Sequence, residues 1–263
     1  MHLKRLVIAF ISIPVLYGYV MYLPPKYFLF LMTLFSTIGL AEFYTMYRIR
    51  GILHYAGLLW GAALPIVFFT LPDLFLPLLL FAALVTMTLR LFIMRDPAGS
   101  LSAVSAVVFG LIYIPGLLTF QLSLVQAGAA WIILLYASVW AADSMAFYVG
   151  KSIGKRKLYP EISPYKTVAG AAGSLLGGVV GAALIKATLL VQISLFQTVM
   201  IGLAIGLSTM VGDLVESMFK RDAGVKDSSH IVPGHGGVLD KLDGVLFAGP
   251  VFYWVCMGLG LIR

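Results

Sequence analysis

The sequence predicts an all-α membrane protein with about nine transmembrane helices and a cytoplasmic N-terminus. The 263 residues are 61% hydrophobic with a mean hydropathy of +1.01, whereas a soluble domain would be nearer half apolar. The apolar residues are spread along the whole chain, and the basic residues collect in alternate loops. Together these observations favour a polytopic helical protein over a soluble one.

Each expected helix is an apolar run near the ~20 residues that cross a bilayer. The first, residues 6–23, follows Lys4 and Arg5 as a signal peptide would, but no small-residue cleavage site comes after it. We therefore interpret it as a span. The nine expected spans are 6–23, 27–46, 53–71, 74–93, 102–121, 127–149, 169–190, 196–218 and 244–262.

The basic residues set the expected orientation. With the N-terminus inside, fifteen of the eighteen Lys and Arg residues fall in cytoplasmic segments, and only Lys26, Lys186 and Arg263 fall outside. This is the positive-inside pattern, so the net charge of +7 reflects topology and not nucleic-acid binding. The only cysteine, Cys256, lies in an apolar run, which excludes an intrachain disulfide and a Cys-based metal site.

The acidic residues divide the chain into two regions. Residues 1–125 carry three acids and are expected to form a scaffold of about five helices. Residues 126–263 carry the other eight and are expected to be catalytic, with cytoplasmic loops at 150–168 and 219–243. We expect one continuous membrane domain.

Two glycine ladders are expected to bring helices close together. Gly173, Gly177 and Gly181 repeat every four residues in one helix, and Gly202 and Gly206 do so in the next. Such spacing suits packing within the chain or a homodimer face.

The end of the expected helix 196–218 carries a polar face. Asp213, Glu216, Ser217 and Lys220 lie at i, i+3, i+4 and i+7 and share one side of the helix. A local pair between Glu216 and Lys220 would be worth little and would leave Asp213 unexplained in an apolar run. A bound cation would account for both carboxylates.

Three more aspartates support that cation site. Asp240 and Asp243 repeat the three-residue spacing before the last span, where helix capping is the alternative explanation. Asp143 ends an apolar helix and precedes a run of lysines that positive-inside topology and anionic headgroups explain. Oxygen ligands alone suit Mg²⁺, which completes its shell with water and phosphates.

Between the two acidic pairs lies a side-chain-poor turn, Gly234-His235-Gly236-Gly237. Its backbone N–H groups could face an anion. His235 fits a general acid or base, a phosphate donor or a simple turn residue, and His230 fits a solvated loop.

These residues closely resemble the signature of the phosphatidate cytidylyltransferases (CDP-diacylglycerol synthases). The match covers roughly residues 143–243 in detail and the rest only in hydropathy. The matching segments are Ile162-Ser163-Pro164-x-Lys166-Thr167, Gly212-Asp213-Leu214-x-Glu216-Ser217, Ser217-x-Phe219-Lys220-Arg221-x4-Lys226-Asp227 and Pro233-Gly234-His235-Gly236-Gly237-x2-Asp240-x2-Asp243.

The resemblance implies a Mg²⁺-dependent enzyme of the bacterial plasma (inner) membrane that joins CTP and phosphatidic acid into CDP-diacylglycerol and releases pyrophosphate. The resemblance does not decide whether a second cation, of unknown identity, shares the site. The implied metal ligands are Asp213, Asp240, Asp243, Glu216 and Asp143. The implied catalytic residues are Asp213, Asp240, Lys220, Arg221 and His235. The implied phosphate-binding residues are Ser217, Lys220, Arg221, Lys226, Asp227, Gly234, His235, Gly236, Gly237, Lys241, Lys166 and Thr167.

Three positions depart from the family pattern. Lys241 replaces an arginine, and Tyr165 and Ala169 replace a lysine and a glutamate. Two other functions fit the polytopic form: a CTP-dependent lipid kinase, which would release CDP, and an ion-coupled transporter. A transporter would distribute its charges through several mid-membrane helices, whereas here they gather at one face.

Overall fold

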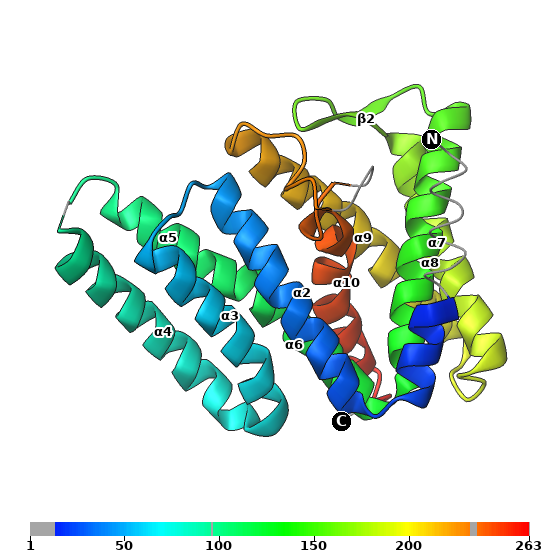
Figure 1. Cartoon of the computed structure of the whole chain (residues 1–263). Coiled ribbons are helices and arrows are strands. Elements are labelled where there is room, and N and C mark those ends of the chain that lie inside the picture. Colours follow the sequence, from blue (N-terminus) through cyan, green and yellow to red (C-terminus); the bar gives the residue numbers. More distant parts are fainter. Residues whose placement is uncertain (1–13, 96, 232–235, 263) are drawn as a thin grey trace.

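The computed structural model describes residues 14–95, 97–231 and 236–262, and these form a helical bundle with one small hairpin (Figure 1). Within these residues, seven helical segments are long and apolar enough to cross a membrane, so the chain is an integral membrane protein. They are Pro25–Met46, Ile52–Thr70, Pro72–Met94, Ser100–Ala127, Ala129–Ile153, Val168–Thr188 and Leu195–Asp222.

Helices α2 to α6 form the N-terminal part. Helix α2 (Pro25–Met46) packs on α3 (Ile52–Thr70), and α4 (Phe75–Leu89) lies outermost, with only 17% of its span buried. Helices α5 (Ser100–Leu111) and α6 (Leu117–Ala127) make one span. A π-helical segment that contains Pro115 joins them, because proline has no N–H for the regular ladder.

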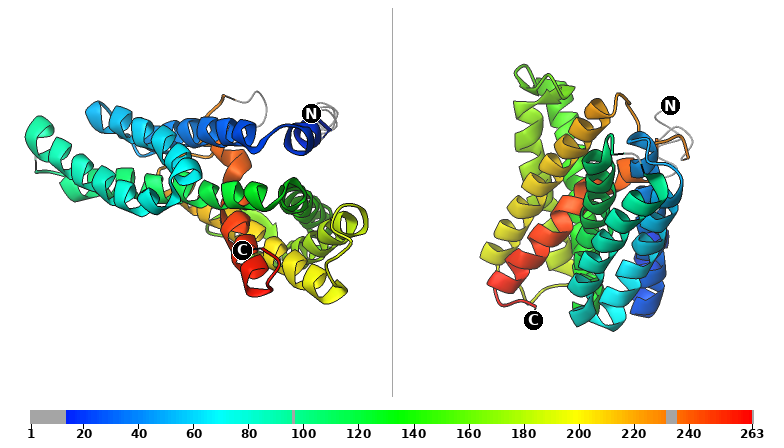
Figure 2. Two further views of the ribbon diagram at one scale, coloured as in Figure 1. Left: turned by 90° about the horizontal axis from the view of Figure 1, so that it is seen from below. Right: turned by 90° about the vertical axis from the view of Figure 1, so that its left-hand side faces the viewer.

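The C-terminal part is built from α7 (Ala129–Ile153), α8 (Val168–Thr188), α9 (Leu195–Asp222) and α10 (Leu239–Gly258). In sequence order each packs on the next, and α10 also contacts α6 (Figure 2). Helix α10 is not among the seven apolar segments, because its first turns carry Asp240, Lys241 and Asp243. The expected first span, 6–23, begins outside the described residues, although residues 14–22 are helical.

The glycine ladders pack within the chain, as one of the two predictions had it. A Cβ on Gly177 would meet Ala141 and Ala142 of α7, and a Cβ on Gly206 would meet Ser174 and Leu175 of α8. Gly202 likewise lies against Val179. Small residues here bring α8 into backbone contact with both α7 and α9.

Helix α8 starts from a short antiparallel hairpin, β1 (Lys157–Tyr159) and β2 (Ser163–Thr167). The Thr167 side chain caps α8 by accepting the Gly170 N–H at 3.0 Å. The hairpin lies at the same end of the bundle as the segment that follows α9 (Figure 1). The two long polar segments therefore meet at one end, and the link between α8 and α9 lies at the other.

This arrangement predicts opposite accessibility for cysteines placed at the two ends. Arg156→Cys, in the exposed segment before β1, should react with an impermeant maleimide only from the cytoplasmic side. Val191→Cys, 68% exposed between α8 and α9, should react only from the other side. Labelling of cells and inverted vesicles would measure this, with the wild-type protein as control because Cys256 is buried. Labelling of both positions from one side would contradict the orientation.

Candidate active site

A cavity of about 820 Å³ lies between α7, the hairpin, α8, α9 and α10. Its volume is typical of small-molecule sites. Part of its lining is apolar and includes Val139, Trp140, Phe147, Met210 and Val245. The rest is densely charged, so the cavity can contact both an apolar chain and a polyanion.

The charged part of the lining brings together carboxylates from three helices and lysines from four segments. The aspartates that line it are Asp143, Asp213, Asp240 and Asp243, and the lysines are Lys151, Lys157, Lys166 and Lys241. Seven of the sequence-predicted site residues thus share one cavity: Asp143, Lys166, Thr167, Asp213, Asp240, Lys241 and Asp243.

Asp213 is a partly exposed carboxylate with two described contacts. Its Oδ2 lies 2.8 Å from Lys166 Nζ, and its Oδ1 accepts the Ser217 hydroxyl at 3.3 Å. The Asp213 side chain is 38% exposed. The ion pair joins the hairpin to α9, and both of its residues line the cavity.

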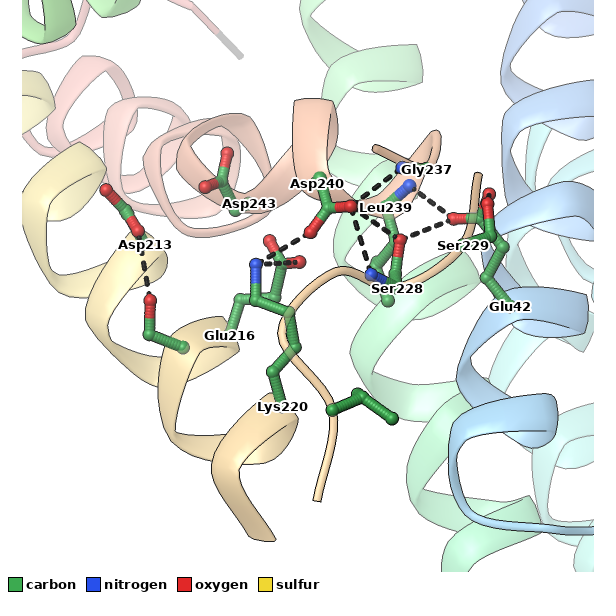
Figure 3. A network of polar contacts seen from close by, with 12 residues as sticks. Glu42, Asp213, Glu216, Lys220, Ser228, Ser229, Gly237, Leu239, Asp240 and Asp243 are labelled. Atoms are coloured by element: carbon green, nitrogen blue, oxygen red, sulfur yellow. Dashed lines mark hydrogen bonds and ion pairs between the residues drawn. The ribbon is translucent and has the colours of Figure 1, made fainter. Parts of the chain in front are cut away.

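Lys220 lies between two carboxylates instead of in the cavity. Its Nζ is 3.0 Å from Glu216 Oε1 and 2.7 Å from Asp240 Oδ1, and Glu216 is fully buried (Figure 3). Here Lys220 neutralises protein carboxylates, which differs from the predicted phosphate contact. Glu216 and Ser217 also lie outside the cavity lining.

Asp240 is held by the chain on both of its oxygens. Besides Lys220, it accepts the Ser228 N–H at 3.0 Å, the Ser228 hydroxyl at 3.0 Å and the Gly237 N–H at 2.7 Å. Burial opposes its ionisation, but the hydrogen bonds from Lys220 and Gly237 outweigh that effect and hold the pKa of Asp240 at about 2. Asp240 therefore anchors the loop, and Asp213, Asp243 and Asp143 are better placed as metal ligands.

The glycine turn directs its described amide toward protein and not toward the cavity. The Gly237 N–H is used by Asp240, and a Cβ on Gly237 would strike Ser228 and Glu42. Gly236 has φ +83°, and a Cβ there would strike Asp240. Glycine is needed here for close approach, and the phosphate contact of this part of the turn stays a prediction. Gly234 and His235 lie outside the described residues.

Three further predicted residues are exposed at the end of α9 or in the loop that follows it. Arg221 donates to the carbonyls of Ile162 at 3.4 Å and Val225 at 3.1 Å, so it ties the hairpin to the end of α9. Lys226 and Asp227 are exposed and do not line the cavity.

The sequence interpretation missed Glu42, which it placed in the scaffold. Glu42 is 3% exposed on α2 and accepts four hydrogen bonds from the loop and from the start of α10 (Figure 3). A lone acid in an apolar helix was the available signal, because such a residue is costly unless it is paired.

The donor set fits a hard cation that shares its shell with a ligand. Asp143, Asp213 and Asp243 supply only oxygen donors from three helices. In the described part of the chain, no three acidic, histidine or cysteine side chains are grouped to hold a metal by themselves. Mg²⁺ suits this arrangement because it takes one or two carboxylates plus water and phosphates.

Comparison with known proteins identifies a family over nearly the whole chain. The profile of the cytidylyltransferase family matches residues 3–258. The chain is 36% identical over 234 residues to the uncharacterized protein YnbB of Escherichia coli (strain K12). The aligned region covers 84% of this chain and 76% of YnbB.

Characterised relatives match a shorter region. The phosphatidate cytidylyltransferase of Bacillus subtilis (strain 168) is 44% identical over 130 residues, 49% of this chain and 48% of that enzyme. The phosphatidate cytidylyltransferase of Thermotoga maritima is 36% identical over 176 residues, 64% of this chain and 65% of that one. The chain spans about half the length of several curated relatives it matches.

The position of Lys220 leads to a stability prediction. Lys220→Met would leave Glu216 and Asp240 as buried carboxylates without their shared cation, which costs about 3–5 kcal/mol. Lys220→Arg should retain most of the stability. Unfolding in mixed micelles would measure this, with Lys226→Met as the exposed control. Equal stability of the two methionine variants would contradict the role assigned to Lys220.

Proposed function

This chain belongs to the cytidylyltransferase family, and from that premise we propose that it is a phosphatidate cytidylyltransferase. It would join CTP and phosphatidic acid into CDP-diacylglycerol and release pyrophosphate. This proposal follows the relatives that are named phosphatidate cytidylyltransferase. The observation that supports this proposal best is the cavity lined by four aspartates, four lysines and several apolar side chains. The apolar side chains suit lipid chains, and the charged ones suit the phosphates of two polyanionic substrates.

The reaction requires two phosphate groups to approach each other. A phosphate oxygen of phosphatidic acid attacks the α-phosphorus of CTP, the new P–O bond forms, and the bond to the β-phosphate oxygen breaks. A phosphate monoester has a second pKa near 6, so this nucleophile needs little help from a general base. Catalysis then depends on positioning and on neutralising charge.

The cavity residues divide these tasks. Lys166, Lys241, Lys151 and Lys157 would neutralise phosphate oxygens, because all four line the cavity. Asp143, Asp213 and Asp243 would hold Mg²⁺ together with the triphosphate. When bound, Mg²⁺ would offset the charge of the triphosphate and of the leaving pyrophosphate. The apolar residues of α7 would receive the first methylenes of the acyl chains.

We place the site on the cytoplasmic face of a bacterial plasma membrane. The hairpin and the segment after α9 share one end of the bundle, and the sequence concentrates basic residues in them. CTP is a cytoplasmic nucleotide, which agrees with that orientation.

A product assay tests the function. Purified protein with CTP labelled in the cytidine moiety, phosphatidic acid and Mg²⁺ should transfer the label to a chloroform-soluble lipid and release one pyrophosphate for each lipid. A lipid kinase would instead leave the label in water-soluble CDP, and a transporter would leave CTP intact. Either result would overturn the proposal.

The proposed metal ligands make a second prediction. Asp213→Asn should reduce turnover more than tenfold, equivalent to about 1.4 kcal/mol of transition-state stabilisation, with little change in stability because the side chain is 38% exposed. Asp240→Asn should lower both turnover and stability, because Asp240 accepts four contacts from the chain.

Steady-state rates against Mg²⁺ concentration, together with micelle unfolding, would separate these effects. Glu161→Gln is the matched control, since Glu161 is an exposed acid at the same end of the bundle and outside the cavity. An Asp213→Asn variant that keeps more than about a tenth of the wild-type rate would remove Asp213 from the ligand set.

A further inference from the structure

Glu42 accepts hydrogen bonds from two separate parts of the loop that follows α9. Its Oε2 accepts the Ser228 hydroxyl at 3.0 Å and the Leu239 N–H at 2.7 Å. Its Oε1 accepts the Ser229 hydroxyl at 2.6 Å and the Val238 N–H at 2.9 Å. The carboxylate thus joins residues about 190 positions away along the chain, as Figure 3 shows.

Two of these donors belong to the start of α10. Val238 precedes the helix, and no side chain of its own caps it. The first N–H groups of a helix have no partner inside it. Glu42 supplies that partner from α2, and its negative charge also suits the positive end of the α10 dipole. The direction in which α10 leaves the loop is therefore set by a residue of the N-terminal region.

Glu42 is carried on a rigid support. The neighbouring Phe43 packs edge-on against Phe219 of α9, with ring centroids 6.3 Å apart, and contacts Tyr113 at 6.1 Å. The Tyr44 hydroxyl donates to the Val107 carbonyl at 3.0 Å. These contacts hold α2 against α5 and α9, and so they also hold the helix segment that carries the carboxylate.

Ser228 of the loop connects Glu42 to the cavity. The Ser228 Oγ lies 3.0 Å from both Glu42 Oε2 and Asp240 Oδ2, and Asp240 in turn contacts Lys220. Asp240 and Asp243 are on the first turns of α10 and line the cavity. A shift of the α10 start would move both of them, together with Lys241.

From this geometry we propose that Glu42 is a positioning residue for the active site. By capping α10 and binding Ser228 and Ser229, it sets where Lys241 and Asp243 lie in the cavity. Glu42 does not line the cavity and would not touch substrate. The expected effect of Glu42 on turnover rests on the proposed function. The expected effect of Glu42 on the order of the loop does not.

Hydrogen exchange tests the structural part without any activity measurement. In Glu42→Gln one acceptor oxygen becomes an NH₂ group that faces N–H and O–H donors. We expect the amides of Ser228, Val238 and Leu239 to exchange at least tenfold faster, with no change in α7 or α8. Asp73→Asn, an exposed acid of the N-terminal region, is the matched control and should leave every segment unchanged.

Kinetics with a double-mutant cycle tests the functional part. Glu42→Gln should reduce kcat at least tenfold, and Ser228→Ala should reduce it in the wild type but have little further effect in Glu42→Gln. Contacts that act through one shared unit are not additive, whereas two independent packing defects would be. Ser229→Ala removes a single hydroxyl and should give a smaller local change, which keeps the test usable if Glu42→Gln does not fold.

Each of the following results supports or overturns the positioning role of Glu42. Unchanged loop exchange in Glu42→Gln and Ser229→Ala, exchange that rises equally in all helices, or additive effects on kcat would overturn the positioning role. If the wild-type protein made no CDP-lipid, the proposed function would fall, and faster exchange confined to the loop would still support the cap that Glu42 provides for α10.

Discussion

The site depends on how several carboxylates are kept together at the end of an apolar bundle. A buried carboxylate is costly unless donors surround it. Glu42 receives four such donors, Asp240 receives four contacts, and Lys220 joins Asp240 to the fully buried Glu216. Because α2, α9, α10 and the loop each contribute, the network forms only when the two halves of the chain are packed. The hydrogen bonds and ion pairs offset its desolvation cost, and the network holds in place residues that line the cavity.

Charge is divided between two neighbouring regions with different tasks. The carboxylates with the most chain donors, Glu42 and Asp240, hold the loop and the start of α10. The more open Asp213, together with Asp143 and Asp243, faces the cavity. A carboxylate saturated with hydrogen bonds has few lone pairs left for a cation, whereas an open one can exchange its partner. This difference would allow neighbouring acids to stabilise the loop and to form the proposed metal site.

Helix packing supports this division. Glycines let α7, α8 and α9 approach to backbone contact, and a Cβ on Gly212 would strike the Asp243 backbone of α10. Close approach at these points draws the ends of α7, α9 and α10 around one cavity. The same end carries the hairpin, whose Lys166 reaches Asp213. The bundle thus gathers residues from four segments that no single helix could present.

The sequence by itself determined the membrane class, most helix positions and the family. For the glycine ladders it left two choices, of which packing within the chain was one. These follow from local composition and spacing: apolar runs of about 20 residues, four-residue glycine repeats and a long mixed motif. It also singled out Asp143, Asp213, Glu216, Asp240 and Asp243 as candidate metal ligands, and these assignments stay predictions. The roles of Lys220, Asp240 and Gly237 were decided only by tertiary structure, because a charged or glycine residue serves a phosphate or a protein carboxylate according to what lies opposite. Glu42 shows the reason most clearly: its partners lie 186 to 197 residues away, and no local pattern encodes a contact made across the bundle.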